Sequence, residues 1–174
     1  MKKQLITVSI YTENFIGLLN RVTTIFTKRH VNIESITASK SEIENVHRYT
    51  ILVEESENLI EKIVKQLEKQ IDVVGAFYHL EDQTIFQEIA LYKVDIENVC
   101  ESKFKEIISV NHAQIVEIEK KFVVVEKTGT KADTDALYNE LKPFGLMQFV
   151  RSGRVAITKQ SMNISEILHN NKKI

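Results

Sequence analysis

The architecture of this chain depends on the segment Thr12-Glu13-Asn14-Phe15-Ile16-Gly17-Leu18-Leu19-Asn20-Arg21-Val22, which is soon followed by His30-Val31-Asn32-Ile33-Glu34-Ser35. An apolar run from Leu5 to Ile10 precedes it and predicts a β-strand. After the turn, apolar residues recur at spacings of three and four, which predicts an amphipathic helix: Leu18, Val22, Ile25 and Phe26. The first backbone N–H groups of such a helix have no partner inside it, and the helix dipole favours negative charge there. The turn is therefore a candidate receptor for a small carboxylate.

The side chains around this turn suggest which carboxylate it would take. The amides of Asn14 and Asn32 would bind the carboxylate or the ammonium group of a free amino acid, and the absence of a Cβ at Gly17 lets a ligand approach the backbone. Apolar neighbours would select an aliphatic side chain. The candidate effector-binding residues are Asn14, Phe15, Ile16, Gly17, Leu18, Asn32 and Ile36. Asn and Gly are also the residues that turns require, so the spacing alone favours an ordinary turn.

Two motifs carry a family resemblance. Glu13–Val22 and Asn32-Ile33-Glu34-Ser35-Ile36 resemble the start of the small, regulatory subunit of acetolactate synthase, and the late Val150-Arg151-Ser152-Gly153 also matches that family. The family begins with an ACT domain, a βαββαβ module that binds amino acids. The resemblance implies that Asn14, Gly17 and Asn32 belong to a valine-binding region between the ACT domains of a dimer, and this favours an effector site over an ordinary turn.

The resemblance also implies a partner and a function. The chain would activate a large catalytic subunit of acetolactate synthase and mediate its feedback inhibition by valine or another branched-chain amino acid. Thiamine diphosphate, Mg²⁺ and FAD would be held by that catalytic subunit, and this chain would hold no cofactor. We therefore expect no catalytic residue here.

The hydrophobic pattern predicts the order βαββαβ twice, which is an α+β fold of two ferredoxin-like domains in tandem. In the first half we expect strands at 5–11, 33–39, 47–53 and 72–80, and helices at 17–29 and after Ser56. In the second half we expect strands at 85–96, 113–118, 122–127 and 146–151, and helices at 97–109 and 130–141, the latter beginning with a capping box of Thr130 and Asp133. The domains would be an ACT domain at 1–81, a linker at 82–84, a second domain at 85–158, and a tail at 159–174. We expect this tail to be mobile or to dock on a partner.

Both helices of a βαββαβ unit cover the same face of its sheet. The other face and the two sheet edges then stay open, although apolar residues are present on that face. A module of this size with an open edge is marginally stable alone. We therefore expect a homodimer at least.

Composition excludes several classes of protein. Of the 174 residues, 43% are hydrophobic and 27% are charged, as in ordinary globular proteins, and the net charge of −1 gives no reason to expect a nucleic acid or an anionic membrane as a partner. No apolar run is long enough for a membrane span, and no signal peptide is evident. The single cysteine, Cys100, cannot form an internal disulfide and is interpreted as a packing residue at a helix start, so we expect a cytoplasmic protein. The five histidines lack metal-ligand spacing.

Three further interpretations stay open at this stage. RNA-recognition modules share the βαββαβ order, but they need stacking aromatics on their central strands, and 5–10 contains none. The chain could also be an ACT-type amino-acid sensor of a different enzyme or a transcription factor. Arg151 and Arg154 flank Ser152-Gly153; they are either a plain strand end with a turn or a contact with a protein partner.

Overall fold

A computed structural model of the chain describes residues 2–99 and 102–171. The described chain forms two compact units: the first contains the residues up to Ile85 and those from Arg154 onward, and the second contains Phe86–Gly153. We expected the second domain to extend to residue 158. The structure instead assigns residues from Arg154 onward to the first unit, because they pack against its sheet. Cys100, which we expected to pack at a helix start, lies outside the described residues.

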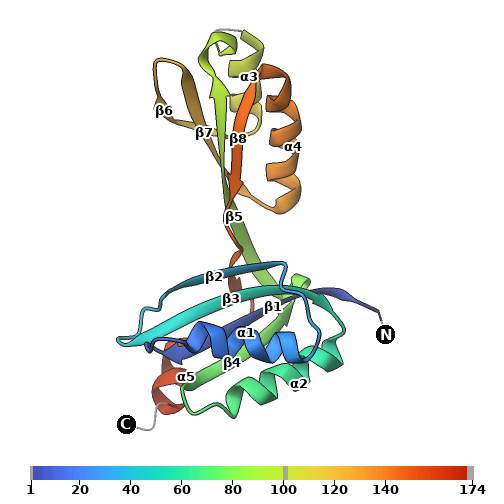
Figure 1. Cartoon of the computed structure of the whole chain (residues 1–174), viewed down its shortest axis with the longest axis vertical. Helices are drawn as coiled ribbons and strands as arrows, with labels where there is room; N and C mark the ends of the chain where they lie inside the picture. Colours follow the sequence, from blue (N-terminus) through green and yellow to red (C-terminus); the bar gives the residue numbers. More distant parts are fainter. Residues whose placement is uncertain (1, 100–101, 172–174) are drawn as a thin grey trace. The chain divides into compact units, whose positions relative to one another are not determined.

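The first unit has the predicted βαββαβ order (Figure 1). Its elements are β1 (Gln4–Glu13), α1 (Leu18–Lys28), β2 (Ser35–Lys40), β3 (Val46–Glu55), α2 (Glu57–Glu68) and β4 (Val73–Leu80), followed by a short 3-10 helix, η1 (Glu81–Gln83). The sheet has the order β2-β3-β1-β4, and every neighbouring pair is antiparallel. This topology confirms the ferredoxin-like prediction and places β2 at one edge of the sheet.

The core of this unit lies between the sheet and the two helices. Strand alternation directs Ile6, Val8 and Ile10 toward the helices, and all three are fully buried. The apolar stripe predicted for the first helix is buried as well: Leu18, Val22, Ile25 and Phe26. Ser56 is the N-cap residue of α2, as expected, although its side chain makes no capping hydrogen bond.

The opposite face of this sheet is covered by the end of the chain. After the second unit, the chain forms β9 (Val155–Thr158) and α5 (Ile164–Asn171). Leu168 of α5 is 1% exposed and packs in a small apolar cluster with Tyr11 and Val46. In Figure 1 this helix, drawn in red, lies by β4. We expected the tail at 159–174 to be mobile or docked on a partner; the part of it that the structure describes, up to residue 171, is docked on its own chain.

The second unit repeats the order. Its elements are β5 (Thr84–Asp95), which starts in the first unit, the 3-10 helix η2 (Ile96–Asn98), α3 (Ser102–Val110), β6 (Gln114–Ile118), β7 (Phe122–Gly129), α4 (Lys131–Leu141), η3 (Lys142–Phe144) and β8 (Leu146–Arg151). The strand path is β6-β7-β5-β8. The capping box at the start of α4 is confirmed, because the Thr130 hydroxyl accepts from the Asp133 N–H and the Asp133 carboxylate accepts from the Thr130 N–H.

The two faces of this second sheet differ. Toward α3 and α4, Tyr92 is fully buried, its hydroxyl donates to the Thr134 carbonyl over 2.7 Å, and burial raises the pKa of Tyr92 to about 12. Away from the helices, Ile89, Leu91 and Val150 are 43%, 42% and 52% exposed. The second unit therefore leaves apolar side chains uncovered on its helix-free face, as the sequence led us to expect.

Candidate functional site

The turn between β1 and α1 is the site that the sequence singled out, and the structure gives it a defined shape (Figure 1). The Asn14 N–H donates to the Asn45 carbonyl over 3.1 Å, and the Glu13 N–H donates to the Asp72 carbonyl over 3.0 Å. Gly17 is the N-cap residue of α1 and has a left-handed backbone with φ of 88°. A non-glycine residue is strained in that conformation. Backbone bonds therefore fix the start of the turn, and a glycine makes the sharp entry into the helix.

At the start of α1, the Leu18 N–H donates to the Phe15 carbonyl over 3.5 Å, and the next two backbone N–H groups are open. The Arg21 N–H donates to the Gly17 carbonyl, whereas no side chain caps the helix and its first turn contains no acidic residue. Within residues 2–99 and 102–171, the N–H groups of Leu19 and Asn20 have no hydrogen-bond acceptor. Unpartnered donors at the positive end of the helix dipole are suited to an anion. The sequence prediction centred on 15–18, where the N–H groups of Phe15, Ile16 and Gly17 also have no acceptor among the described residues.

The side chains of the turn are unevenly exposed. Phe15 is 62% exposed and Ile16 is 104% exposed, so two apolar side chains project into solvent. Leu18, by contrast, is 3% exposed and belongs to the interior. The Leu18 N–H donates to the Phe15 carbonyl, so Leu18 contributes to the interior and not to a ligand contact, whereas Phe15 and Ile16 are free to cover a ligand or a second protein surface.

The structure does not bring Asn14 and Asn32 together within one chain. Ser35, at the start of β2, is in register with Leu52, and Leu52 is in register with Thr7 of β1. Asn14 lies seven residues beyond Thr7, which is roughly 23 Å along a strand. Asn32 precedes Ser35 and so lies further still from Asn14. One small ligand cannot contact both amides of one copy.

Asn32 and Ile36 lie at the open edge of the sheet. The Asn32 side-chain amide donates to the Glu34 carboxylate over 2.9 Å, which fixes its orientation. Ile36, on the edge strand β2, is 37% exposed. The site residues therefore form two groups at opposite ends of the unit: Asn14–Leu18 at one, and Asn32 with Ile36 at the other.

The two arginines proposed as partner contacts are both engaged inside the chain. Arg151 forms ion pairs with Asp135 at 2.7 Å and with Glu88 at 3.3 Å. Arg154 is 3% exposed, contacts Glu81 at 3.3 Å and donates to the Thr7 hydroxyl. The Arg154 guanidinium is therefore held beneath the surface, because the segment that carries it folds back onto the sheet, and it does not present a contact for a partner. A contact through Arg151 stays a prediction.

Other kinds of site find little support in the described residues. Within 2–99 and 102–171, no group of three or more His, Cys, Asp or Glu side chains could hold a metal ion. None of the helices described is both long enough and apolar enough to cross a membrane. The RNA-binding interpretation needs an open, aromatic helix-free face. In the first unit that face carries Thr7, Ser9 and Tyr11 on β1, and all three are buried.

Comparison with known protein families gives two matches that together span most of the chain. A family model described as "AHAS small subunit-like ACT domain" matches residues 8–75. A second, described as "Small subunit of acetolactate synthase", matches residues 87–160.

Individual proteins and a solved structure agree with these matches. The chain is 37% identical to the acetolactate synthase small subunit of Bacillus subtilis over 90% of this chain and 91% of that protein. It is 32% identical to the Mycobacterium leprae small subunit over 92% and 95% of the two chains. The crystal structure of the Thermotoga maritima small subunit superposes with a TM-score of 0.82 at 26% identity, covering 91% of this chain and 99% of that one.

Proposed function

The chain belongs to the family of acetolactate synthase small subunits, and we propose that it activates a catalytic subunit and makes that subunit sensitive to a branched-chain amino acid, with valine the first candidate. The observation that carries this proposal is the open helix start after Gly17. Two unpartnered N–H groups, a helix dipole and no acidic side chain in the first turn make a site for an α-carboxylate. Exposed Phe15 and Ile16 would cover an aliphatic side chain.

We further propose that two copies of the chain build each effector site. The carboxylate-binding turn and Asn32 lie too far apart in one copy to share a small ligand, as the strand register shows. Two first units placed side by side across β2 and α1, related by a twofold axis, would bring the turn of one copy to the Asn32 end of the other. Leu19 and Ile36 are 43% and 37% exposed and would be covered in that arrangement. Joining two β2 edges would also satisfy the open backbone groups there.

The catalytic chemistry is assigned to the partner. We propose that thiamine diphosphate, Mg²⁺ and FAD are bound by the catalytic subunit, as the resemblance to the family implies. The uncovered apolar face of the second unit, with Leu91 and Val150, is a surface that a protein partner could cover. Both subunits would then work in the cytoplasm.

Regulation by such a site follows from linkage. An effector shifts an equilibrium only by binding one arrangement more tightly than another. A ligand held between two copies binds the dimer in which the β1–α1 turn of each copy faces Asn32 of the other. The ligand is released when the two copies separate. The catalytic subunit would respond to that change in the paired first units, and the coupling would act in both directions.

The test is the response of a reconstituted holoenzyme to valine. We expect Asn14→Ala and Asn32→Ala each to leave activation of the catalytic subunit intact and to raise the valine concentration needed for inhibition by about tenfold, the effect of one charge-assisted hydrogen bond. Asn58→Ala is the matched control, since Asn58 is an exposed asparagine on α2. Full valine sensitivity in both site variants would refute the site, and failure of the wild-type chain to activate any catalytic subunit would refute the function.

A further inference from the structure

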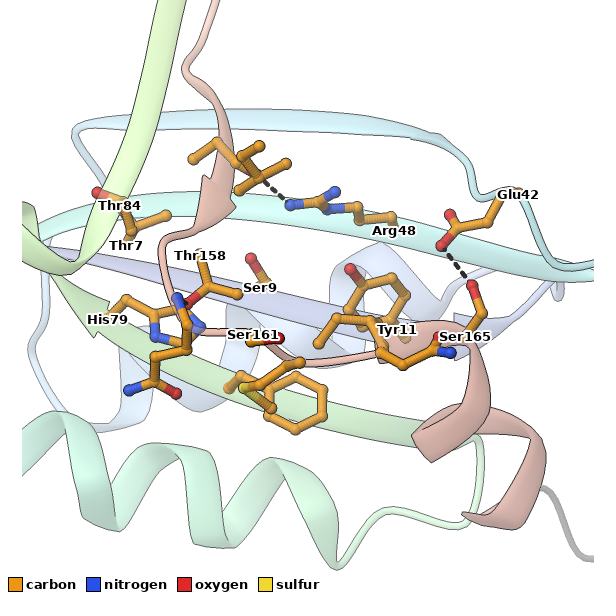
Figure 2. Close-up of a pocket in the computed structure, with 17 residues that line it drawn as sticks. Thr7, Ser9, Tyr11, Glu42, Arg48, His79, Thr84, Thr158, Ser161 and Ser165 are labelled. Atoms are coloured by element: carbon orange, nitrogen blue, oxygen red, sulfur yellow. Dashed lines mark hydrogen bonds between the residues drawn. The ribbon is translucent and has the colours of Figure 1, made fainter.

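A cavity of about 560 Å³ lies on the helix-free face of the first unit, away from the β1–α1 turn. Strands β1, β3 and β4 form its floor, and the returning segment from Ala156 to Ser165 forms its cover (Figure 2). A volume of this size is typical of small-molecule sites. The cavity is therefore large enough for a ligand and lies within one unit of one chain.

The floor of the cavity is polar although it is buried. Thr7, Ser9 and His79 are 1%, 6% and 8% exposed, and all three line the cavity. The Thr7 hydroxyl accepts from Arg154, whereas the Ser9 hydroxyl has no hydrogen-bond partner in the part of the chain that the structure describes. Buried polar groups are normally paired, and packing alone would be served better by apolar residues, as on the other face of the same sheet.

Arg48 is the one positively charged side chain among the residues that line this cavity. Its Nη2 donates to the Ala156 carbonyl, and its guanidinium lies 5.6 Å from the centre of the Tyr11 ring. Its buried Nε has no hydrogen-bond partner. No carboxylate of the described residues lies within ion-pair distance of it. A guanidinium that is largely removed from water and lacks a counter-ion is costly unless an anion joins it.

The other lining residues limit which anion fits. Burial lowers the pKa of His79, so this imidazole adds no second positive charge near neutral pH. Glu42 lies at one side, where its carboxylate accepts from the Ser165 hydroxyl, and it disfavours a multiply charged ligand (Figure 2). Tyr11, Phe77 and Met162 supply apolar and aromatic surface. One positive charge beside an apolar wall matches a ligand with one negative charge and an apolar body.

We propose that this cavity binds a small organic monocarboxylate. The carboxylate accepts hydrogen bonds from the Arg48 guanidinium and from the Ser9 hydroxyl, and the apolar body lies against Phe77 and Met162. The ligand bridges the sheet and the returning segment, so its binding holds that segment in place. This site is separate from the proposed effector site and does not depend on it.

The methionines provide a direct readout. The chain contains Met1, Met147 and Met162; Met162 lines the cavity, and Met147 lies on β8 of the second unit. The full-length protein, labelled with ¹³C at the methionine methyl groups, is titrated with butanoate, 3-methylbutanoate and phenylacetate. Butanamide is the uncharged control, and inorganic phosphate is the alternative anion. We expect a saturable shift of the Met162 signal with at least one carboxylate, a stationary Met147 signal, and no effect of butanamide.

Variants connect the signal to the cavity. Arg48→Gln should weaken carboxylate binding by at least about tenfold, whereas Arg29→Gln, at an exposed arginine after α1, should not change it. Ser9→Leu keeps the charge, removes the hydroxyl donor and places a bulky group where the carboxylate would lie. It should therefore also abolish the shift of the Met162 signal, and it tests the site independently if Arg48→Gln misfolds. Asn14→Ala should bind the carboxylate normally even if valine sensitivity is lost. The proposal is overturned if no carboxylate shifts Met162, if phosphate binds in preference, or if Arg48→Gln and Ser9→Leu, both folded, bind as wild type does.

Discussion

Replacing Gly17 by alanine separates the two roles of this residue, which are to make the turn and to leave room for a ligand. A Cβ at this position would meet no atom within 4 Å, so the substitution creates no steric clash inside the chain. The cost to folding comes only from the backbone, whose φ of 88° is unfavourable for a residue with a side chain. That cost is about 1–2 kcal/mol. It should lower the melting temperature by roughly 2–4 °C for each kcal/mol if the two units unfold together.

Gly17→Ala should weaken effector binding more than it weakens folding. The open space beside Gly17 is where we place the carboxylate, so an added methyl group would crowd the ligand rather than the protein. Crowding of this kind costs about 1–3 kcal/mol, which is about five- to 150-fold in the dissociation constant of valine. Urea unfolding measures the first quantity, and calorimetric titration with valine measures the second.

Gly17→Asn is the matched control for strain, because asparagine tolerates the left-handed region better than alanine does. It should restore part of the stability without restoring valine affinity. A loss of stability above about 4 kcal/mol would mean that the position is packed, contrary to the open space in the structure. Unchanged valine affinity in Gly17→Ala would refute the close approach of the ligand.

Three further predictions concern the parts of the fold that position the sites. Leu168→Ala should loosen α5 from the sheet, because this leucine is 1% exposed and such truncations cost about 2–5 kcal/mol. Hydrogen exchange of the α5 backbone amides should become faster, while that of α3 and α4 should not change. Because burial lowers the pKa of His79 from 6.5, the unfolded chain binds its proton more tightly, so the free energy of unfolding should fall as pH drops below about 6.5. His79→Gln should remove that part of the pH dependence in urea titrations, and an unchanged slope would contradict the assignment. Thr130→Ala removes the capping box of α4 and should cost about 1 kcal/mol in urea unfolding, whereas Thr27→Ala, at an exposed threonine on α1, should cost less.

Much of the fold followed from local sequence because local periodicity and tertiary burial agree. Alternation along β1 and the stripe of Val22, Ile25 and Phe26 on α1 coincide with the buried residues of the first core. The same holds in the second unit, where Tyr92 and Val94 are buried and Leu91 is not. Where a strand and the helices of the same unit bury their apolar faces against one another, the periodicity of a short segment is enough to predict which side chains are buried.

The returning segment could not be placed in this way. The polar residues Thr7 and Ser9 alternate with apolar ones on β1, which is the pattern of a solvent-facing side, yet residues about 150 positions later in the chain cover them. Local sequence likewise left Arg154 open as either a plain strand end with a turn or a contact with a protein partner, and did not indicate its burial against the first sheet. The apolar spacing of Ile164, Ile167 and Leu168 predicted a short helical pattern but not the surface on which it packs, because a pairing of distant segments leaves no periodic signal in either one.

The separation of Asn14 from Asn32 was also beyond the sequence. Both residues flank α1, and only the register of β2 with β3 and of β3 with β1 shows that they lie at opposite ends of the unit. A site that needs both must therefore combine two copies. This inference is the centre of the functional account, and it makes a stoichiometric prediction.

The most direct test mixes the Asn14→Ala and Asn32→Ala chains after unfolding and refolding them together, and counts tight valine sites by calorimetry. If each site takes Asn14 from one copy and Asn32 from the other, a mixed dimer has one site with both defects and one intact site. Random mixing should then restore about a quarter of the wild-type sites, although neither variant alone has any. Absence of restored tight sites in a mixture shown to contain mixed dimers would mean that one chain supplies both asparagines, and would contradict the account.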